Sequence, residues 1–175
     1  MLHSELDAPS DWVVRWAHLI PAGGRVLDVA SGSGRHARWL VERGHAVDAV
    51  DRDAAALAKL ASVTGVRILA ADIENEPWPY ARGEFAGVVV TNYLHRPLFP
   101  ELIAALAPDG VLIYETFAEG NERYGRPSNP EFLLRPGELL ELLRGGFRVI
   151  GYEDTCVERP KLALVQRVCG VKSTP

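Results

Sequence analysis

The segment VLDVASGSGRH (residues 26–36) joins an apolar run to a helical pattern through a loop of small residues. The run RVLDVA (25–30) has the composition of a buried strand, and RHARWLVERG (35–44) places apolar side chains on one helical face. Between them, Gly32 and Gly34 allow the backbone to come close to a ligand. This order of strand, glycine loop and helix predicts an α/β fold with a ligand site at the first loop.

Short apolar runs and amphipathic stretches continue to alternate along the chain, without an internal repeat. The connection VERP (157–160) confines Pro160 to a turn between the last two runs, which predicts an antiparallel hairpin. The whole pattern predicts a Rossmann-like, three-layer α/β sandwich around a mostly parallel sheet. Further strands are expected at 45–51, 66–72, 83–93, 111–117, 147–155 and 161–171, and helices at 10–20, 53–65 and 100–107.

Length and composition indicate a single domain covering residues 1–175, since 47% of the residues are hydrophobic and can form one full core. No apolar run approaches the roughly 20 residues that span a bilayer, and the first residues are acidic where a signal peptide is basic. We therefore expect a cytoplasmic protein without a membrane segment. The hairpin separates Cys156 from Cys169, which favours two small buried thiols over a disulfide.

The charge pattern argues against binding through many phosphate contacts, because the formal net charge is −4 and basic residues are scattered among acidic ones. A small-molecule partner is favoured, although a patch of arginines that forms only on folding remains an alternative that would bind nucleic acid. We expect either a monomer or a homodimer. The five histidines have no ligand-like spacing, so no metal site is expected.

Acidic residues lie near or at the ends of the first three predicted strands. Asp28 precedes the glycine loop, where a carboxylate suits a ligand with a positive amino or sulfonium group and repels a pyrophosphate. Asp51 ends the second strand at the position where a carboxylate grips a ribose diol. Asp72 can accept a hydrogen bond from an exocyclic amine while Ile73 offers an apolar wall to a purine, although a helix cap or a solvated strand end explains Asp72 alone equally well.

Together these motifs resemble the class I S-adenosylmethionine-dependent methyltransferases. The resemblance extends from about residue 26 to residue 117 and rests on VLDVASGSG, AVDAVD, ADIENEPWP, FAGVVVTNYLH and APDGVLIYET. The segment RHARWLVERGHAVDAVDRD is similar in sequence to the small bacterial proteins related to the tellurite-resistance methyltransferase. This resemblance implies a seven-stranded sheet with a reversed final strand, and S-adenosylmethionine as the cofactor.

The resemblance also implies roles for individual residues. Asp28, Ser31 and Gly32 would face the methionine end of the cofactor, and Asn92 would lie beneath it. Ala30 stands where the family's loop usually has its first glycine, which implies a slightly shifted loop that still binds. Asp51 and Arg52 would flank the ribose and adenine, and Asp72 and Ile73 the adenine. The expected cofactor-binding residues are thus Asp28, Ala30, Ser31, Gly32, Gly34, Asp51, Arg52, Asp72, Ile73 and Asn92.

We expect the methyl acceptor to be a small molecule, and the sequence does not identify it. A base is optional in an in-line methyl transfer, and the candidates are His95, Glu115 and Tyr124. His95 is explained equally well as a cap of the following helix. The residues after Asn92 do not form the Asn-Pro-Pro-Tyr signature, which disfavours amino-methylation of nucleic acid. Residues 118–135 form either a lid that selects the acceptor or an ordinary surface loop.

Two other functions fit parts of this pattern. An NAD-dependent oxidoreductase also has a glycine loop after its first strand and an acid after its second, but the spacing here is not G-x-G-x-x-G, because His36 and Ala37 follow the loop. A cofactor-binding protein that has lost catalysis would have a blocked or featureless acceptor pocket. The polar residues from 121 to 135 argue against that second alternative.

Overall fold

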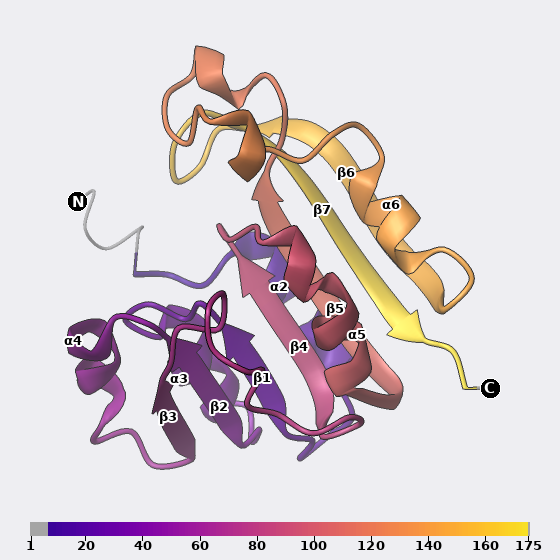
Figure 1. Cartoon of the computed structure of the whole chain (residues 1–175). Coiled ribbons are helices and arrows are strands. Elements are labelled where there is room, and N and C mark those ends of the chain that lie inside the picture. The colour runs from indigo at the N-terminus through magenta and orange to yellow at the C-terminus, as the bar shows by residue number, and fades with distance from the viewer. Residues whose placement is uncertain (1–6, 175) are drawn as a thin grey trace.

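A seven-stranded sheet forms the centre of the molecule, which is described by a computed structural model over residues 7–174. Five strands are parallel in the order β3-β2-β1-β4-β5, and β7 lies antiparallel between β5 and β6 (Figure 1). The predicted sandwich with its C-terminal hairpin is therefore confirmed. The strands are β1 (Val26–Val29), β2 (Val47–Asp51), β3 (Val66–Ala70), β4 (Phe85–Thr91), β5 (Leu106–Phe117), β6 (Phe147–Val157) and β7 (Ala163–Lys172).

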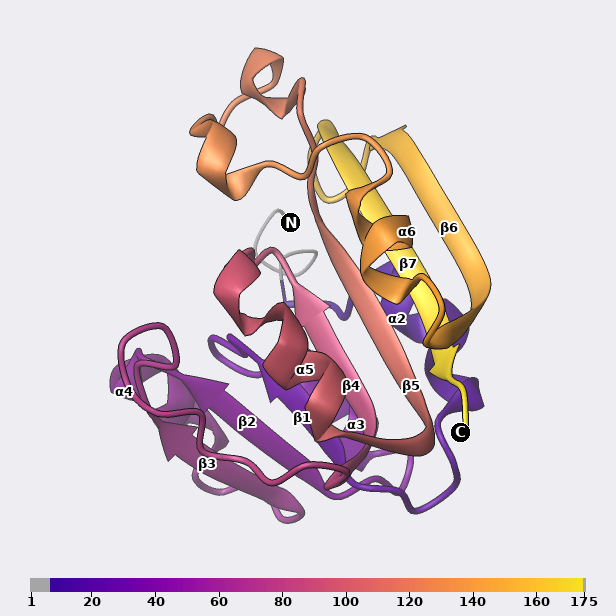
Figure 2. The same ribbon diagram turned by 45° about the vertical axis from the view of Figure 1, so that its right-hand side comes forward.

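Helices cover both faces of the sheet, as Figure 2 shows for α5 and α6 on one side and α2 and α3 on the other. Each face buries its own apolar cluster, one holding Leu102 and Leu139 and the other holding Trp12 and Leu40. The helices are α2 (Asp11–Trp16), α3 (Arg35–Val41), α4 (Ala54–Leu57), α5 (Phe99–Ala105) and α6 (Glu138–Leu143). Short 3-10 turns are η1 (Ala17–Leu19), η2 (Ala58–Leu60), η3 (Arg96–Leu98), η4 (Asn121–Arg123) and η5 (Pro130–Phe132).

The central strand β1 is buried along its whole length, because it pairs with β2 on one side and with β4 on the other. Strand order therefore reverses at β1, and the chains that leave β1 and β4 diverge toward opposite halves of the sheet. In open α/β sheets such a switch point opens a crevice at the carboxyl ends of the strands, where ligands bind. From this topology we expect a ligand site at the carboxyl ends of β1, β2 and β4.

Three local expectations differ from the structure. The helix expected over 53–65 is only α4 followed by the 3-10 turn η2, and these two short elements bury Leu57 and Leu60 in the core. Helix α6 was not expected, since its six residues are too few to display a helical period. Cys156 is exposed, whereas Cys169 is buried as expected, and both are free thiols.

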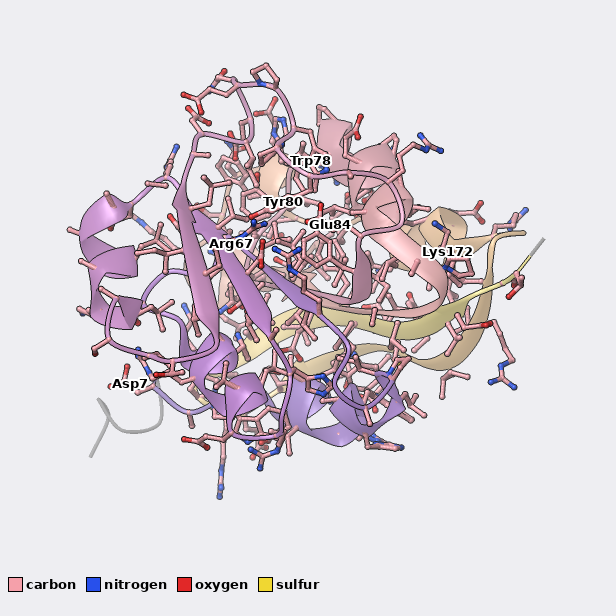
Figure 3. The ribbon with its side chains drawn as sticks, turned by 90° about the horizontal axis from the view of Figure 1, so that it is seen from below. Asp7, Arg67, Trp78, Tyr80, Glu84 and Lys172 are labelled. Atoms are coloured by element: carbon pink, nitrogen blue, oxygen red, sulfur yellow. The ribbon has the colours of Figure 1, made fainter. Side chains whose placement is uncertain are left out.

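A network of charged side chains lies at the amino ends of the strands, at the end of the sheet opposite the switch point. The Asp48 carboxylate, 3% exposed, accepts from Arg25 Nε and Nη2 at 2.9 Å each and also from the Arg67 guanidinium. Arg25 Nη1 continues to Glu84 Oε1 at 2.8 Å. Figure 3, seen from below, places Arg67, Tyr80 and Glu84 close together at this end. These charges satisfy one another at the amino ends of the strands, so the network is structural.

None of the helices within residues 7–174 is both long and apolar enough to cross a membrane.

Candidate functional site

Three residues of the loop after β1 have a left-handed backbone conformation. Ala30, Gly32 and Gly34 have φ values of 51°, 53° and 79°. A Cβ at position 34 would lie 2.3 Å from Leu60 Cδ1, so glycine there lets the loop pack against η2. At Gly32 an added Cβ would meet nothing within 4 Å, so the free side of the loop faces open space. The loop thus packs on one side and leaves room for a ligand on the other.

Two buried polar atoms beside this loop have no hydrogen-bond partner within residues 7–174. Asp28 Oδ2 and Ser31 Oγ form no hydrogen bond among the described residues, although Asp28 is only 1% and Ser31 9% exposed. Burial raises the pKa of the Asp28 carboxyl to about 7, while the Ala37 backbone amide and Arg35 act in the opposite direction. An unpaired buried polar group costs roughly 1–3 kcal/mol, so this pair fits a ligand that brings hydrogen-bond donors.

Asp51 joins the end of β2 to the first loop. Its Oδ2 accepts the Gly32 backbone N–H at 2.8 Å, and its Oδ1 accepts the Asp53 N–H at 2.8 Å. Each carboxylate oxygen has two lone pairs, so both oxygens can still accept from a ligand hydroxyl. Arg52, the next residue, is exposed.

Asp72 and Ile73 occupy the turn that follows β3. Asp72 Oδ2 accepts from Asn75 Nδ2 at 2.9 Å and Oδ1 accepts from the Glu74 N–H at 3.2 Å, contacts that lower the pKa of the Asp72 carboxyl. Ile73 is 7% exposed and belongs to the core cluster on the α5 side. Asn92, directly after β4, has φ of 54° and is exposed.

A cavity of about 740 Å³ lies next to the carboxyl ends of β4 and β5. Asn92 and Glu115 line it from the ends of β4 and β5, and Arg35 lines it from the first turn of α3. Residues 8–11, which we call the N-terminal strap, form one side, and residues 157–163 at the tip of the β6–β7 hairpin form another. The site therefore combines the first loop with an adjoining chamber of small-molecule size.

Of the three candidate bases, Glu115 lines the cavity and the other two do not. Glu115 Oε1 accepts from Ser10 Oγ at 2.6 Å and Oε2 accepts from Arg167 Nη1 at 3.0 Å. His95 Nδ1 lies 3.9 Å from Glu74 Oε2, at the start of η3. Tyr124 is 45% exposed at the end of η4. The assignment of a catalytic base stays a prediction for all three residues.

The segment 118–135 follows the carboxyl end of β5 and lies next to the amino end of β7 (orange in Figure 1), and hydrogen bonds attach it to the sheet. Asn121, 1% exposed, donates from Nδ2 to the Pro127 carbonyl at 3.0 Å and accepts the Leu164 N–H at 3.2 Å. Lys161 Nζ donates to the Arg126 carbonyl at 3.0 Å. None of residues 118–135 lines the 740 Å³ cavity, and the role of this segment as a lid stays a prediction.

The N-terminal strap was missed from the sequence, as were its partners on α3. The Ser10 N–H donates to His36 Nε2 at 3.1 Å, and the Ser10 hydroxyl caps α2 by accepting the Trp12 N–H. Arg35 Nη1 donates to the Ala8 carbonyl at 3.1 Å. The Ser-Asp pair at the start of α2 is a helix-cap signal, but nothing local predicts that this cap contacts α3.

No group of three His, Cys, Asp or Glu side chains in the described part of the chain could hold a metal ion. The first loop instead brings together a buried carboxylate, a hydroxyl and, at the end of β2, a second carboxylate, which can accept hydrogen bonds from ligand N–H and O–H groups.

Comparisons with known proteins agree with this geometry. A family model described as a methyltransferase domain matches residues 26–110. Among curated proteins, none matches this chain. TehB from Haemophilus influenzae is similar in fold, with a TM-score of 0.79 and 17% identity over 94% of this chain and 63% of TehB. The chain thus spans less than two thirds of the length of TehB.

Two further solved structures share the fold at similar identity. An S-adenosylmethionine-dependent methyltransferase from Mesorhizobium loti has a TM-score of 0.71 and 18% identity, covering 90% of this chain and 97% of its own. The 1,6-didemethyltoxoflavin-N1-methyltransferase from Burkholderia thailandensis, with 1,6-didemethyltoxoflavin and S-adenosylhomocysteine bound, has a TM-score of 0.68 and 22% identity. That alignment covers 98% of this chain and 80% of the other.

Proposed function

We propose that this chain, whose residues 26–110 match a methyltransferase domain, uses S-adenosylmethionine to methylate a small molecule held in the cavity beside Asn92 and Glu115. The cavity carries this proposal. Its volume of about 740 Å³ falls within the roughly 300–1,000 Å³ typical of small-ligand sites. Apolar side chains such as Phe117 and Val165 line it together with the charged groups. The bound 1,6-didemethyltoxoflavin in the Burkholderia enzyme supports a small acceptor here as well.

The residues at the switch point fit the cofactor. Asp28 and Ser31, with unpaired buried oxygens, would hold the ammonium of the methionine end, and Asp51 would accept from the ribose hydroxyls. Gly32 would let the backbone lie against the ligand. The remaining predicted cofactor-binding residues are Ala30, Gly34, Arg52, Asp72, Ile73 and Asn92.

When bound, S-adenosylmethionine supplies a methyl group on a sulfonium, which an acceptor nucleophile takes by in-line displacement, leaving a neutral thioether. The chain contributes mainly by positioning the acceptor and excluding water. Glu115 faces the cavity and is our candidate to orient the acceptor or to accept its proton. Its carboxylate is held by Ser10 and Arg167, so its direction is fixed before a ligand arrives.

Transfer of an isotopically labelled methyl group tests this proposal. The chain is incubated with methyl-labelled S-adenosylmethionine and with separate small-metabolite, RNA and protein fractions of a cell extract. We expect label to enter the small-metabolite fraction, and Glu115→Gln to reduce that incorporation. Label confined to the RNA or protein fraction would contradict a small-molecule acceptor.

A further inference from the structure

A second pocket, of about 510 Å³, lies between the segment 118–135 and the tip of the β6–β7 hairpin. Phe117 and Lys161 line both this pocket and the larger cavity beside Glu115, so the two hollows adjoin. The second pocket therefore extends the proposed acceptor site toward the segment 118–135. Its apolar walls are Phe117, Pro127 and Phe132, and its charged side chains are Arg126 and Lys161.

The Phe132 ring is held beside this pocket although 50% of it is exposed. It ends the turn η5, which the Asn129 side chain caps by accepting the Glu131 N–H at 3.0 Å. On either side of the ring, Arg96 donates to the carbonyls of Glu131 and Leu133 at 2.8 Å each. The exposed ring is thus carried by a tethered backbone, and with Phe117 it offers flat apolar surface to a ligand.

The two cations of the pocket have donors to spare. Lys161 Nζ donates to the Arg126 carbonyl at 3.0 Å and lies 5.6 Å from the centre of the Phe117 ring. Within residues 7–174, no carboxylate oxygen lies within 4.0 Å of either cation, and the Arg126 guanidinium forms no hydrogen bond. An ammonium offers three donors and a guanidinium five, so most of this capacity is unused.

The positive charge of the second pocket is local. The chain as a whole has a formal net charge of −4, yet no Asp or Glu lines this pocket. Glu158, the acid at the tip of the hairpin, lines only the larger cavity. An acid group of a ligand would therefore meet two cations there without displacing a protein carboxylate.

Strand β5 connects the second pocket to the proposed site of methyl transfer. Glu115 and Phe117 lie two residues apart on this strand, so their side chains share a face and are about 7 Å apart. Asn92 and Glu115 line the larger cavity and not the second pocket. An acceptor that lies beside Glu115 and enters the second pocket is thus at least roughly 7 Å long, the length of an aromatic acid with two fused rings.

We propose that the second pocket binds an acid group of the methyl acceptor, a carboxylate or a phosphate, between Arg126 and Lys161. The flat apolar body of the acceptor lies against Phe117 and Phe132. This inference rests on the proposed function, because it concerns the acceptor of the same transfer. A guanidinium holds either acid through paired N–H···O bonds, and the ammonium adds a point charge. The methyl group goes to another atom of the acceptor, in the larger cavity, so the acid group keeps its charge.

Three probes with the same two-ring body test this inference: 2-naphthoate, 2-naphthyl phosphate and the neutral 2-naphthamide. Their dissociation constants are measured by NMR titration of the chain saturated with S-adenosylhomocysteine. The wild type is compared with Arg126→Gln, Lys161→Gln and Phe132→Ala. Arg148→Gln is the control, because it removes one exposed positive charge from β6 at a position that lines neither pocket.

The wild type should bind at least one of the two acids about tenfold more tightly than the amide. Arg126→Gln and Lys161→Gln should each reduce this preference about threefold, as expected for a partly exposed ion pair, and Arg148→Gln should keep it. Phe132→Ala should weaken acid and amide alike, because it removes an apolar wall and no charge. The acid that binds more tightly identifies the group as a carboxylate or a phosphate.

Equal affinity of the wild type for the acids and the amide would overturn the inference. A preference that Arg126→Gln and Lys161→Gln leave unchanged would overturn it as well. Equal weakening of acid and amide in these variants would show that the two residues shape the pocket and do not bind the acid. A chain that does not bind S-adenosylhomocysteine loses the proposed function too, whereas one that binds it without preferring the acids refutes this inference alone.

The charge of the labelled product is a second measurement, made on the acceptor itself. Labelled small metabolites from the transfer assay should be retained by an anion exchanger at pH 7, because the acid group is not methylated. Label that enters the small-metabolite fraction but passes the exchanger unretained would contradict an acidic acceptor.

Discussion

The Gly32 N–H donates to Asp51 Oδ2 at 2.8 Å, so the loop after β1 is tied to the last residue of β2. Glycine at position 32 has φ of 53° and faces open space, and the acid comes from the neighbouring parallel strand. The bond fixes the distance between two parts of the site that are 19 residues apart in sequence. A hydrogen bond therefore joins the proposed ribose and methionine subsites before a ligand binds.

Asp51→Ala should weaken S-adenosylmethionine binding by about 1.5 to 3 kcal/mol, because it removes a charged acceptor of hydroxyl hydrogen bonds. Titration calorimetry measures the effect. Asp53→Ala is the control: its carboxylate caps α4 through the Ala56 N–H at 3.0 Å, so its loss should cost about 1 kcal/mol of stability and little affinity. Unchanged affinity in a folded Asp51→Ala protein would remove this residue from the site.

Asp28→Asn should stabilise the ligand-free protein at pH 8 and at the same time weaken its binding of S-adenosylmethionine. Burial raises the folded-state pKa of Asp28 from 3.8 to about 7. The stability contributed by the protonated acid is complete below pH 3.8 and is lost as the pH rises through 7, because the unfolded carboxyl ionises first. The amide cannot ionise, so the advantage of the variant should grow from pH 4 to pH 8, to on the order of 3 kcal/mol.

Denaturant unfolding of both proteins across that pH range is the measurement. Parallel stability curves for wild type and Asp28→Asn would show that the buried carboxyl does not titrate in this range. A variant that unfolds at every pH would assign Asp28 a structural role.

His36→Asn should change the pH dependence of stability in the opposite direction. Burial and the charge of Arg35 lower the pKa of His36 from 6.5 to about 3, and its Nε2 accepts the Ser10 N–H. The neutral imidazole contributes stability above pH 6.5 that is lost as the pH falls toward 3. Between about pH 4 and 6.5, ionisation of Asp28 lowers the free energy of unfolding of the wild type as the pH rises, and deprotonation of His36 raises it. The two effects therefore offset each other. Relative to wild type, stability of His36→Asn should fall as the pH rises through this window, and a constant difference would contradict this account.

Ala30→Gly should raise the free energy of unfolding by about 0.5 to 1 kcal/mol. Alanine at φ of 51° is strained by roughly 1–2 kcal/mol, part of which glycine loses again through unfolded-state entropy. Ala81→Gly, in an exposed loop without positive φ, should only destabilise. Equal destabilisation by both substitutions in denaturant titrations would show that position 30 carries no strain.

The sequence predicted the parts of the site that depend on local order. The apolar strand, the small-residue loop and the helix around Gly32 lie within 20 residues, and the acid at Asp51 ends a recognisable strand. What was missed depends on contacts distant in sequence. Arg35 lines the cavity only because the N-terminal strap and the ends of β4 and β5 come together beside it. Helix α6 is fixed by Gln166, whose Oε1 accepts the Leu139 N–H at 2.7 Å, and by the Arg96–Glu138 ion pair at 2.6 Å.

Calorimetric titration of the wild-type chain with S-adenosylmethionine, S-adenosylhomocysteine and NAD tests the central claim most directly. We predict saturable binding of the first two ligands at one site and no binding of NAD, because Asp28 suits an ammonium and a sulfonium and repels a pyrophosphate. Binding of NAD alone, or of none of the three, would contradict the assignment of this fold and site to methyl transfer.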